Sequence, residues 1–310
     1  MALVVAAAAA LAGGLGALGP HAWWLELFAH FRPQYAVLLA ASGIALVALG
    51  APASGLAAAA LAVVNALPLL HYYAPPPQPQ AEVHGPELRA VLINVYFRNA
   101  DHERLLDYLH AVQPDVAVFL EATPAWRKSL RRLAAVLPHQ AESGELFVAS
   151  RWPLTVLRAE PFGGDDAGAM VFTLDAGGRP FTVVGAHASW PLGRACSARR
   201  NEQLVELARL VRAAPAPVLL LADLNLTAFT PRFAQFLADA DLADCSAGRG
   251  WQPGWPALFP PLALRIDHCL HGAGVEPRRV ATGPFIGSDH YPLEVTLRFR
   301  DAALPPTSPR

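Results

Sequence analysis

The sequence is poor in excess charge, in lysine and in cysteine. Its 310 residues carry 24 basic and 25 acidic side chains, so the formal net charge is −1. Lys128 is the only lysine, and arginine supplies the other cations. No global positive field therefore marks the chain as a nucleic-acid binder, which argues against a nuclease that works on long duplexes, although a local basic patch remains compatible with this balance.

Charge is almost absent from the first quarter of the chain. Before Glu82, only Glu26 and Arg32 are formally charged. Three apolar runs, residues 2–18, 35–49 and 54–70, are separated by short turns and flanked by aromatic side chains, as in membrane spans. A soluble hairpin would need a polar face that this composition lacks. We predict a membrane region over residues 1–73 with about three transmembrane helices. Two spans are the alternative count, and a cleaved signal peptide is the rival interpretation of the first run.

Proline marks the end of this region. Residues 74–87 include the run Pro75-Pro76-Pro77 and predict a stiff, extended linker. Residues 88–299 are expected to form a soluble domain, and residues 300–310 a tail. Arg32 is the only basic side chain near a membrane end, so the positive-inside rule would place the soluble domain in the cytoplasm, on the evidence of a single residue.

The soluble part alternates strands and helices. Apolar runs predict strands over residues 88–95, 116–120, 146–149, 156–159, 170–174, 180–187, 218–221, 265–270, 275–281 and 292–297. Helical spacing predicts helices over residues 102–112, 124–137, 197–213 and 231–240. Because some neighbouring strands are joined by tight turns, part of the sheet should be antiparallel. This order predicts a layered α/β sandwich.

Polar side chains follow several of these strands. Asp223 and Asn225 come directly after an apolar run, and an Asx turn would explain this pair if it stood alone. The pattern recurs along the chain, however, and gives a candidate set of Asn94, Glu121, His187, Asp223, Asn225, Asp267, Asp289 and His290. Four carboxylates, two amides and two histidines without a cysteine suit Mg²⁺ or Mn²⁺ and make a poor zinc site. Such a set is suited to the attack of water on phosphorus.

Three motifs strengthen this interpretation. They are Asp223-Leu224-Asn225, Arg265-Ile266-Asp267-His268 and Gly287-Ser288-Asp289-His290-Tyr291-Pro292. With Asn94 and Glu121, and in this order, they make residues 88–299 resemble the endonuclease/exonuclease/phosphatase superfamily. The apolar N-terminal part and the proline-rich linker resemble a bacterial membrane-anchored branch of that superfamily.

The resemblance implies a four-layered α/β sandwich of the DNase I-like type and metal-dependent phosphoester hydrolysis. It also implies roles: Glu121, Asn94 and Asp289 in the metal region, Asp223 and Asn225 on the attacking water and the phosphate, His187 on the phosphate, and His290 as an acid/base oriented by Asp267. Which carboxylate acts as the base is left open. His268 should point to the opposite face of its strand and is interpreted as structural.

The three cysteines fit no metal motif. Cys269 is expected to be a small buried residue, and a disulfide between Cys196 and Cys245 is the alternative that we considered. The membrane-anchored branch places its catalytic domain outside the cytoplasm. We therefore favour the inner membrane of a bacterium, with the soluble domain on the outer, periplasmic face. This is opposite to the cytoplasmic location that Arg32 and the positive-inside rule indicate.

Three functions are compared. The first is a membrane-anchored nuclease or phosphodiesterase, with a nucleic acid or a phosphorylated small molecule or lipid as substrate. The second is a lipid or inositol phosphate phosphatase or a phospholipase C-like enzyme, and the third is a non-catalytic binding module, which would lack a site residue. Trp255 and Phe259 lie in a proline-rich segment that either faces substrate or membrane or packs on its own domain. The oligomeric state stays open.

Overall fold

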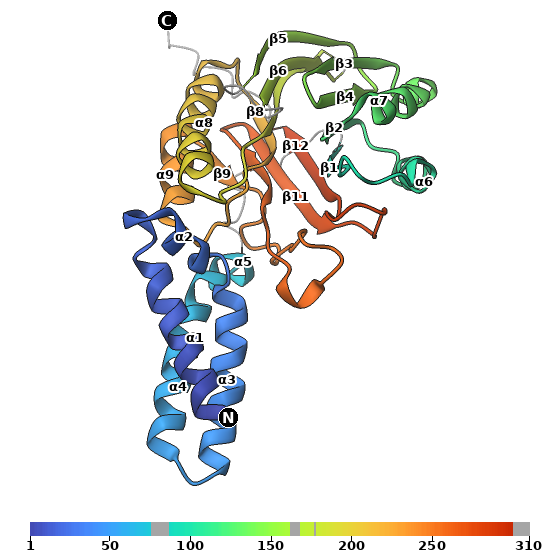
Figure 1. The fold of residues 1–310 in the computed structure, drawn as a ribbon. Coiled ribbons are helices and arrows are strands. Elements are labelled where there is room, and N and C mark those ends of the chain that lie inside the picture. Colours follow the sequence, from blue (N-terminus) through green and yellow to red (C-terminus); the bar gives the residue numbers. More distant parts are fainter. Residues whose placement is uncertain (76–86, 162–167, 177, 300–310) are drawn as a thin grey trace, which may run out of the picture.

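The computed structural model describes residues 1–75, 87–161, 168–176 and 178–299. It contains an N-terminal helical shaft and a two-sheet body above it (Figure 1). Most of the predicted linker and the predicted tail lie outside the described residues.

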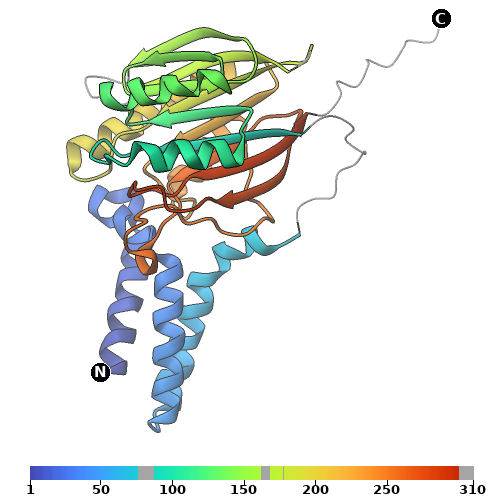
Figure 2. The ribbon, with the colours of Figure 1, turned by 90° about the vertical axis from the view of Figure 1, so that its right-hand side faces the viewer.

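Two six-stranded sheets form the body (Figures 1 and 2). The first has the order β11-β12-β1-β2-β4-β3, with β1 (Leu88–Asn94), β2 (Val116–Leu120), β3 (His139–Ser143), β4 (Leu146–Ser150), β11 (Val275–Thr282) and β12 (Leu293–Phe299). The second has the order β5-β6-β7-β8-β10-β9, with β5 (Leu154–Pro161), β6 (Gly168–Asp175), β7 (Pro180–His187), β8 (Val218–Asp223), β9 (Ala243–Asp244) and β10 (Asp267–His271). Only β1–β2 and β7–β8 pair in parallel among the described strands.

Helices cover the outer faces of both sheets. On the first sheet lie α6 (His102–Val112), α7 (Pro124–Leu130) and the 3₁₀ helix η3 (Arg131–Ala135), and on the second α8 (Arg194–Ala213) and α9 (Pro231–Ala240). The sheets approach each other closely at Gly185, where a Cβ would lie 2.8 Å from Val118 Cγ1. The predicted four-layer DNase I-like sandwich is confirmed. The expected helix over residues 124–137 is divided into α7 and η3.

The shaft consists of α1 (Ala2–Ala17), η1 (Gly19–His21), α2 (Trp23–Ala29), α3 (Arg32–Ala48), α4 (Pro52–Ala66), η2 (Leu67–Leu69) and α5 (Leu70–Tyr73). The α3–α4 turn and Met1 lie away from the body (Figure 1). Small residues bring α3 and α4 together, because a Cβ at Gly55 would lie 2.8 Å from Gly43 O. Many large apolar side chains of the shaft remain exposed, among them Val37, Ile44 and Leu56.

The helices of the shaft differ in length, and therefore in whether they could cross a membrane. Pro52–Tyr73, with 22 residues, is long and apolar enough to cross a membrane, and α2 with α3 would count as one more span bent by 59°. The 16 residues of α1 reach roughly 24 Å, short of the about 30 Å of a hydrocarbon core. By length and composition, the described helices therefore include one candidate span, or two if the bent pair is counted. The chain breaks at η1 and near His30, which the apolar runs do not reveal.

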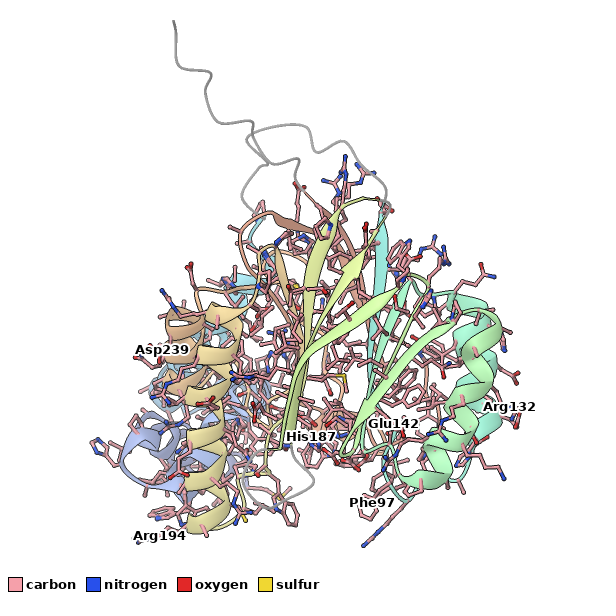
Figure 3. All side chains as sticks on the ribbon, turned by 90° about the horizontal axis from the view of Figure 1, so that it is seen from above. Phe97, Arg132, Glu142, His187, Arg194 and Asp239 are labelled. Atoms are coloured by element: carbon pink, nitrogen blue, oxygen red, sulfur yellow. A yellow bond between two sulfur atoms is a disulfide. The ribbon has the colours of Figure 1, made fainter. Side chains whose placement is uncertain are left out.

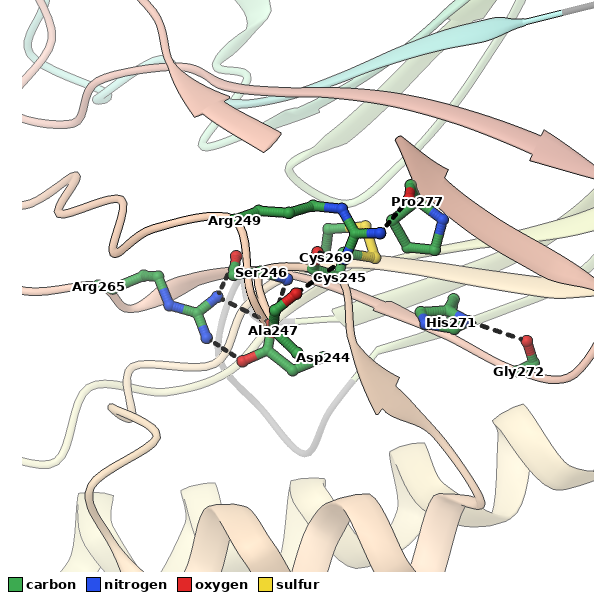
Figure 4. Close-up of a disulfide and its surroundings, with 10 residues drawn as sticks. All are labelled: Asp244, Cys245, Ser246, Ala247, Arg249, Arg265, Cys269, His271, Gly272 and Pro277. Atoms are coloured by element: carbon green, nitrogen blue, oxygen red, sulfur yellow. Dashed lines mark hydrogen bonds and ion pairs between the residues drawn. A yellow bond between two sulfur atoms is a disulfide. The ribbon is translucent and has the colours of Figure 1, made fainter. Parts of the chain in front are cut away.

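Cys269 is buried as expected, but the alternative pairing of Cys196 with Cys245 is wrong. Cys245 and Cys269 form a disulfide, with Cα atoms 5.4 Å apart (Figure 4). Cys196 is free. Cys196 lies in α8 and not in a loop. The pairing depends on β9, whose contact with β10 places Asp244 opposite Leu270. A two-residue strand leaves no signal in the sequence, so the partner of Cys269 could not be foreseen.

Candidate active site

Strand register brings three predicted site residues together where the neighbouring strands β7 and β8 end and β10 begins. His187 and Asp223 are partners in the parallel β7–β8 pair, and Asp223 faces Asp267 in the antiparallel β8–β10 pair. Asp223 and Asp267 are almost fully buried. Figure 3 shows His187 at this edge, between the two sheets. Buried ionisable groups are costly unless they are paired, so a network of partners is expected here.

That network is nearly symmetric about Asp223. His290 Nδ1 lies 2.9 Å from Asp267 Oδ2, which is the hydrogen bond expected from the sequence. His187 Nδ1 hydrogen-bonds Glu145 in the same way. The Nε2 atoms of His187 and His290 lie 3.7 and 3.9 Å from Asp223 Oδ2. Each imidazole is thus oriented by one carboxylate and directed toward the same third carboxylate.

Glu145 is the site residue that the sequence analysis missed. It lies in the turn between β3 and β4, and its carbonyl accepts a hydrogen bond from Ala122 N at 2.9 Å, just after Glu121. Residues 139–143 were not predicted as a strand, so the β3–β4 hairpin and its turn were not expected. A Glu in a turn carries no strand-end signal.

The carboxylates set the protonation of both histidines. Burial opposes the charged form, but the hydrogen bond to Glu145 and its charge outweigh it and raise the pKa of His187 to about 10. In the same way Asp267 outweighs burial and raises the pKa of His290 to about 9. Burial and the charge of Asp267 raise the pKa of Asp223, while the histidines lower it. Two imidazolium groups therefore face Asp223 at neutral pH.

The first sheet contributes Asn94 and Glu121. Asn94 Nδ2 donates to Glu121 Oε1 at 2.9 Å and approaches Asp223 Oδ2 at 3.4 Å, so it connects the two sheets. Glu121 Oε2 accepts from Phe97 N at 3.0 Å. Tyr96, Glu121 and Asn225 have positive φ angles of 59°, 57° and 48°. This conformation is unfavourable for most side chains, and such residues cluster at functional sites.

Asn225 fastens the segment after β8. Its amide N–H donates to Asp223 Oδ1 at 2.9 Å, and its Nδ2 donates to Ala188 O at 2.9 Å. The Asx turn suggested by the sequence is therefore present, and it fixes the Asp223 carboxylate while Oδ2 faces the histidines. His268 points to the opposite face, where its Nε2 lies 2.7 Å from Leu226 O, in agreement with a structural role.

The segment before β12 delivers Asp289 and His290. Ser288 Oγ donates to Asn94 O at 2.8 Å and accepts from His290 N at 3.0 Å. Gly287 has φ +88°, and a Cβ there would lie 2.8 Å from Asn99 Oδ1, so glycine is required. Asp289 Oδ2 accepts from Trp255 Nε1 at 3.2 Å.

The donor chemistry fits a divalent cation. Asp223, Asp267 and His290 each offer an atom, all within 4.8 Å of one another. Asp267 and His290 already hydrogen-bond each other, so we also considered the carboxylates on the other side of the site as metal ligands. Asp289 Oδ1 is buried without a hydrogen-bond partner, and burial together with the charge of Glu121 raises the pKa of Asp289. Carboxylates that repel each other, one with an unsatisfied oxygen, suit a hard cation such as Mg²⁺.

The two-sheet body and this cluster of carboxylates and histidines define a phosphoesterase. The chain belongs to the Endonuclease/Exonuclease/phosphatase family, whose model matches residues 91–290. It is therefore a metal-dependent phosphoesterase of that family. No curated protein matches the chain.

Solved structures share the fold. The D. rerio TDP2 structure with a single-strand DNA product is 20% identical with a TM-score of 0.58, over 69% of this chain and 100% of that chain. Sphingomyelinase C from Streptomyces griseocarneus is 23% identical with a TM-score of 0.53, over 68% and 99%. A Staphylococcus aureus beta toxin mutant with bound magnesium ions is 18% identical with a TM-score of 0.54, over 70% and 100%.

Proposed function

We propose that this protein is a membrane-anchored phosphodiesterase that depends on Mg²⁺ or Mn²⁺. The observation that carries the proposal is the pair of carboxylate-oriented histidines directed at Asp223 Oδ2, 3.7 and 3.9 Å away. Two protonated imidazoles can bind the oxygens of a phosphodiester and protonate the group that leaves. A carboxylate between them with a raised pKa is suited to receive the proton of the attacking water.

The proposed reaction assigns one task to each residue. Asp223, held by Asn225, aligns the water and takes its proton as the new phosphorus–oxygen bond forms. His290, oriented by Asp267, gives its proton to the leaving oxygen as the old bond breaks, and His187, oriented by Glu145, binds a phosphoryl oxygen. Asp223 gains one proton and His290 loses one, so the net charge of the site does not change. The site returns to its starting state when Asp223 releases its proton to water and His290 takes one up.

Glu121 and Asp289 are the proposed metal ligands, with Asn94 beside them. The bound ion would neutralise negative charge on the phosphate. Asn94 orients Glu121 through its Nδ2, and its Oδ1 accepts from Tyr96 N at 3.0 Å. This choice uses the unsatisfied Oδ1 of Asp289 and leaves the Asp267–His290 hydrogen bond intact.

The test is hydrolysis by the purified full-length chain in detergent. Bis-p-nitrophenyl phosphate, DNA, RNA and phospholipid vesicles are each assayed with Mg²⁺, with Mn²⁺ and with EDTA. We expect metal-dependent cleavage of the diester that is lost in EDTA. Absence of metal-dependent turnover on every substrate would refute the function.

A lipid phosphodiester is the second candidate substrate class, and a specific observation favours it. Large apolar side chains are exposed on the segments beside the site: Phe97, Trp190, Leu192, Leu258, Phe259, Leu262 and Phe285. Leu258 is 70% exposed, and its segment also carries Trp255, which contacts Asp289. The orange turn of this segment (η4, Pro260–Leu262) is the lowest part of the body, next to the shaft (Figures 1 and 2). Apolar side chains at that level fit the interface of a bilayer.

The test of this candidate compares two substrates. Leu258→Ser with Phe259→Ser should lower cleavage of phospholipid in vesicles at least tenfold and leave cleavage of soluble bis-p-nitrophenyl phosphate unchanged. Equal rates on both substrates would exclude a lipid-facing role.

We propose an outer, periplasmic location for the body. The disulfide between Cys245 and Cys269 supports an oxidising compartment. The charge count that favours the cytoplasm rests on Arg32, whose Nε is buried at the start of α3, so Arg32 belongs to a packed junction and not to a free loop. Alkaline phosphatase fused to the C-terminus should be active on intact cells, and an inactive fusion would place the body in the cytoplasm.

A further inference from the structure

The shaft contacts the body through polar groups, which is unusual for a region with so little charge. Before Glu82, the formally charged residues are Glu26 and Arg32. Glu26 lies in α2 and is buried, with 6% of its surface exposed. A carboxylate placed in a predicted membrane region and then buried calls for a specific partner.

That partner is Arg200 of α8. Arg200 NH2 lies 2.8 and 2.9 Å from the two oxygens of Glu26, and Arg200 is fully buried. Removing one member of such a pair would leave a buried charge without compensation. The contact therefore joins the shaft to the body at one defined position.

Arg200 also reaches the active site. Its NH1 donates to Asn225 O at 3.1 Å, on the segment that fixes Asp223. A second contact lies two residues further on, where His30 Nδ1 is 2.9 Å from Thr227 Oγ1. Glu26 within α2 and His30 at its C-terminal end thus contact two positions of the segment 223–227, Glu26 through Arg200 and His30 directly.

The other side of the site is held from α5. Arg265 NH2 donates to Tyr72 OH at 3.2 Å, and Arg265 also pairs with Asp244. Figure 4 shows Arg265 beside Asp244, near the disulfide. His71 O and Tyr72 O accept hydrogen bonds from Gly248 N and Gly250 N at 3.0 and 2.8 Å. Arg265 lies two residues before Asp267, so the shaft contacts the flanks of both Asp223 and Asp267.

We propose that the N-terminal helical region is part of the catalytic scaffold, and that Glu26 and His30 are positioning residues for the segment that carries Asp223 and Asn225. Glu26 acts through Arg200 on Asn225 O, and His30 acts through Thr227. Asn225 has φ +48°, a conformation that needs support from its surroundings. Without these contacts the Asp223 carboxylate loses its fixed place between the two histidines. The shaft therefore does more than tether the body.

The competing account is that the junction only adds stability, and one pair of variants separates the two accounts. The experiment uses the full-length chain in detergent and rests on the proposed function for its kinetic readout. Glu26→Gln should lower kcat per folded molecule at least tenfold and leave KM within threefold. In Glu26→Gln with Arg200→Met, both buried charges are gone and the melting temperature should recover, since apolar groups replace a buried ion pair well. The double variant also lacks the hydrogen bond that Arg200 donates to Asn225 O, so kcat should stay low.

A second pair of variants avoids any change of buried charge. Thr227→Val removes the hydroxyl that His30 contacts and keeps the shape, so kcat should fall severalfold, and Thr227→Ser should restore it. Gln34→Ala is the matched control. Gln34 Nε2 contacts Ala263 O at 3.2 Å across the same junction but away from the segment 223–227, so this variant should keep wild-type kcat.

Hydrogen exchange supplies a readout that does not need turnover. In Glu26→Gln, exchange should rise in peptides that cover residues 222–230 and stay unchanged in β2. Recovery of kcat together with melting temperature in the double variant would overturn the positioning role. So would a change of exchange in Glu26→Gln that is the same for residues 222–230 as for β2. If the wild-type chain hydrolyses none of the substrates, the proposed function fails, and the exchange experiment still decides this inference.

Discussion

The shaft and the body differ in where they place their large apolar side chains. The body places its large apolar residues between and behind the sheets, with Val118, Leu220 and Phe119 fully buried. The shaft packs small residues such as Gly43 and Gly55 inside and leaves Val37, Ile44 and Leu56 exposed. An arrangement with large apolar residues outside is stable when the surroundings are lipid. Glu26 is buried where these two regions meet and pairs there with Arg200, so the junction is a specific polar contact between two apolar regions.

The largest expected effect is the loss of turnover when the His290–Asp267 pair in the body is removed. His290→Ala and Asp267→Asn should each lower turnover about 10²–10⁴-fold, the usual contribution of acid–base help. Because the two residues act as one unit, the double variant should lose little more than either single variant. All three are measured as kcat per folded molecule on bis-p-nitrophenyl phosphate. Losses that multiply would contradict the paired mechanism, and a full rate in Asp267→Asn would mean that Asp267 only stabilises its strand.

The second effect concerns the metal. Glu121→Gln keeps the shape of the side chain and removes its charge, so the Mg²⁺ concentration needed for half-maximal rate should rise well over tenfold. Glu142→Gln, a carboxylate that pairs with Arg131 at 2.9 Å on the surface of β3, is the control. An unchanged Mg²⁺ requirement in Glu121→Gln would remove Glu121 from the metal region.

The third effect tests the shaft's packing. Gly55→Leu should push α3 and α4 apart, because even a Cβ at Gly55 would lie 2.5 Å from Val47 Cγ2. Overpacking typically costs about 1–3 kcal/mol. Gly14→Ala is the control, since a Cβ there meets nothing within 4 Å. Thermal unfolding in detergent measures both, and equal stability of the two variants would show that the small residues do not define the bundle.

A fourth effect is a pH dependence of stability without metal. The folded-state pKa values of about 10 for His187 and about 9 for His290 lie above the unfolded value of about 6.5. Their contribution to the free energy of unfolding is therefore complete below pH 6.5 and is lost as pH rises through 9 to 10. In EDTA, the melting temperature of the full chain should fall over this window. His187→Gln with His290→Gln should reduce that slope, and an unchanged slope would mean that the carboxylates do not hold the two protons.

The sequence predicted those features that depend on one strand or helix at a time. β7 and α9 were placed with their observed ends because apolar alternation, Pro231 and a preceding Thr230 define them locally. Asn94 and Glu121, and likewise His187 and Asp223, came together because parallel neighbours end on the same side of a sheet, whereas Asp267 meets Asp223 because it begins an antiparallel strand. The contacts that could not be predicted join residues distant in the chain. They are the hydrogen bond of Glu145 to His187, the disulfide of Cys245 with Cys269 and the ion pair of Glu26 with Arg200. No local pattern carries a contact across 42, 24 or 174 residues.

The most direct test of the central claim is diester hydrolysis in water labelled with ¹⁸O. The full-length chain, with Mg²⁺ and bis-p-nitrophenyl phosphate, should place one ¹⁸O atom on phosphorus at each turnover, and both EDTA and Asp223→Asn should suppress the reaction. This result is predicted because Asp223, between two imidazolium groups, directs water to phosphorus. Metal-independent cleavage, or a full rate in folded Asp223→Asn, would contradict the account.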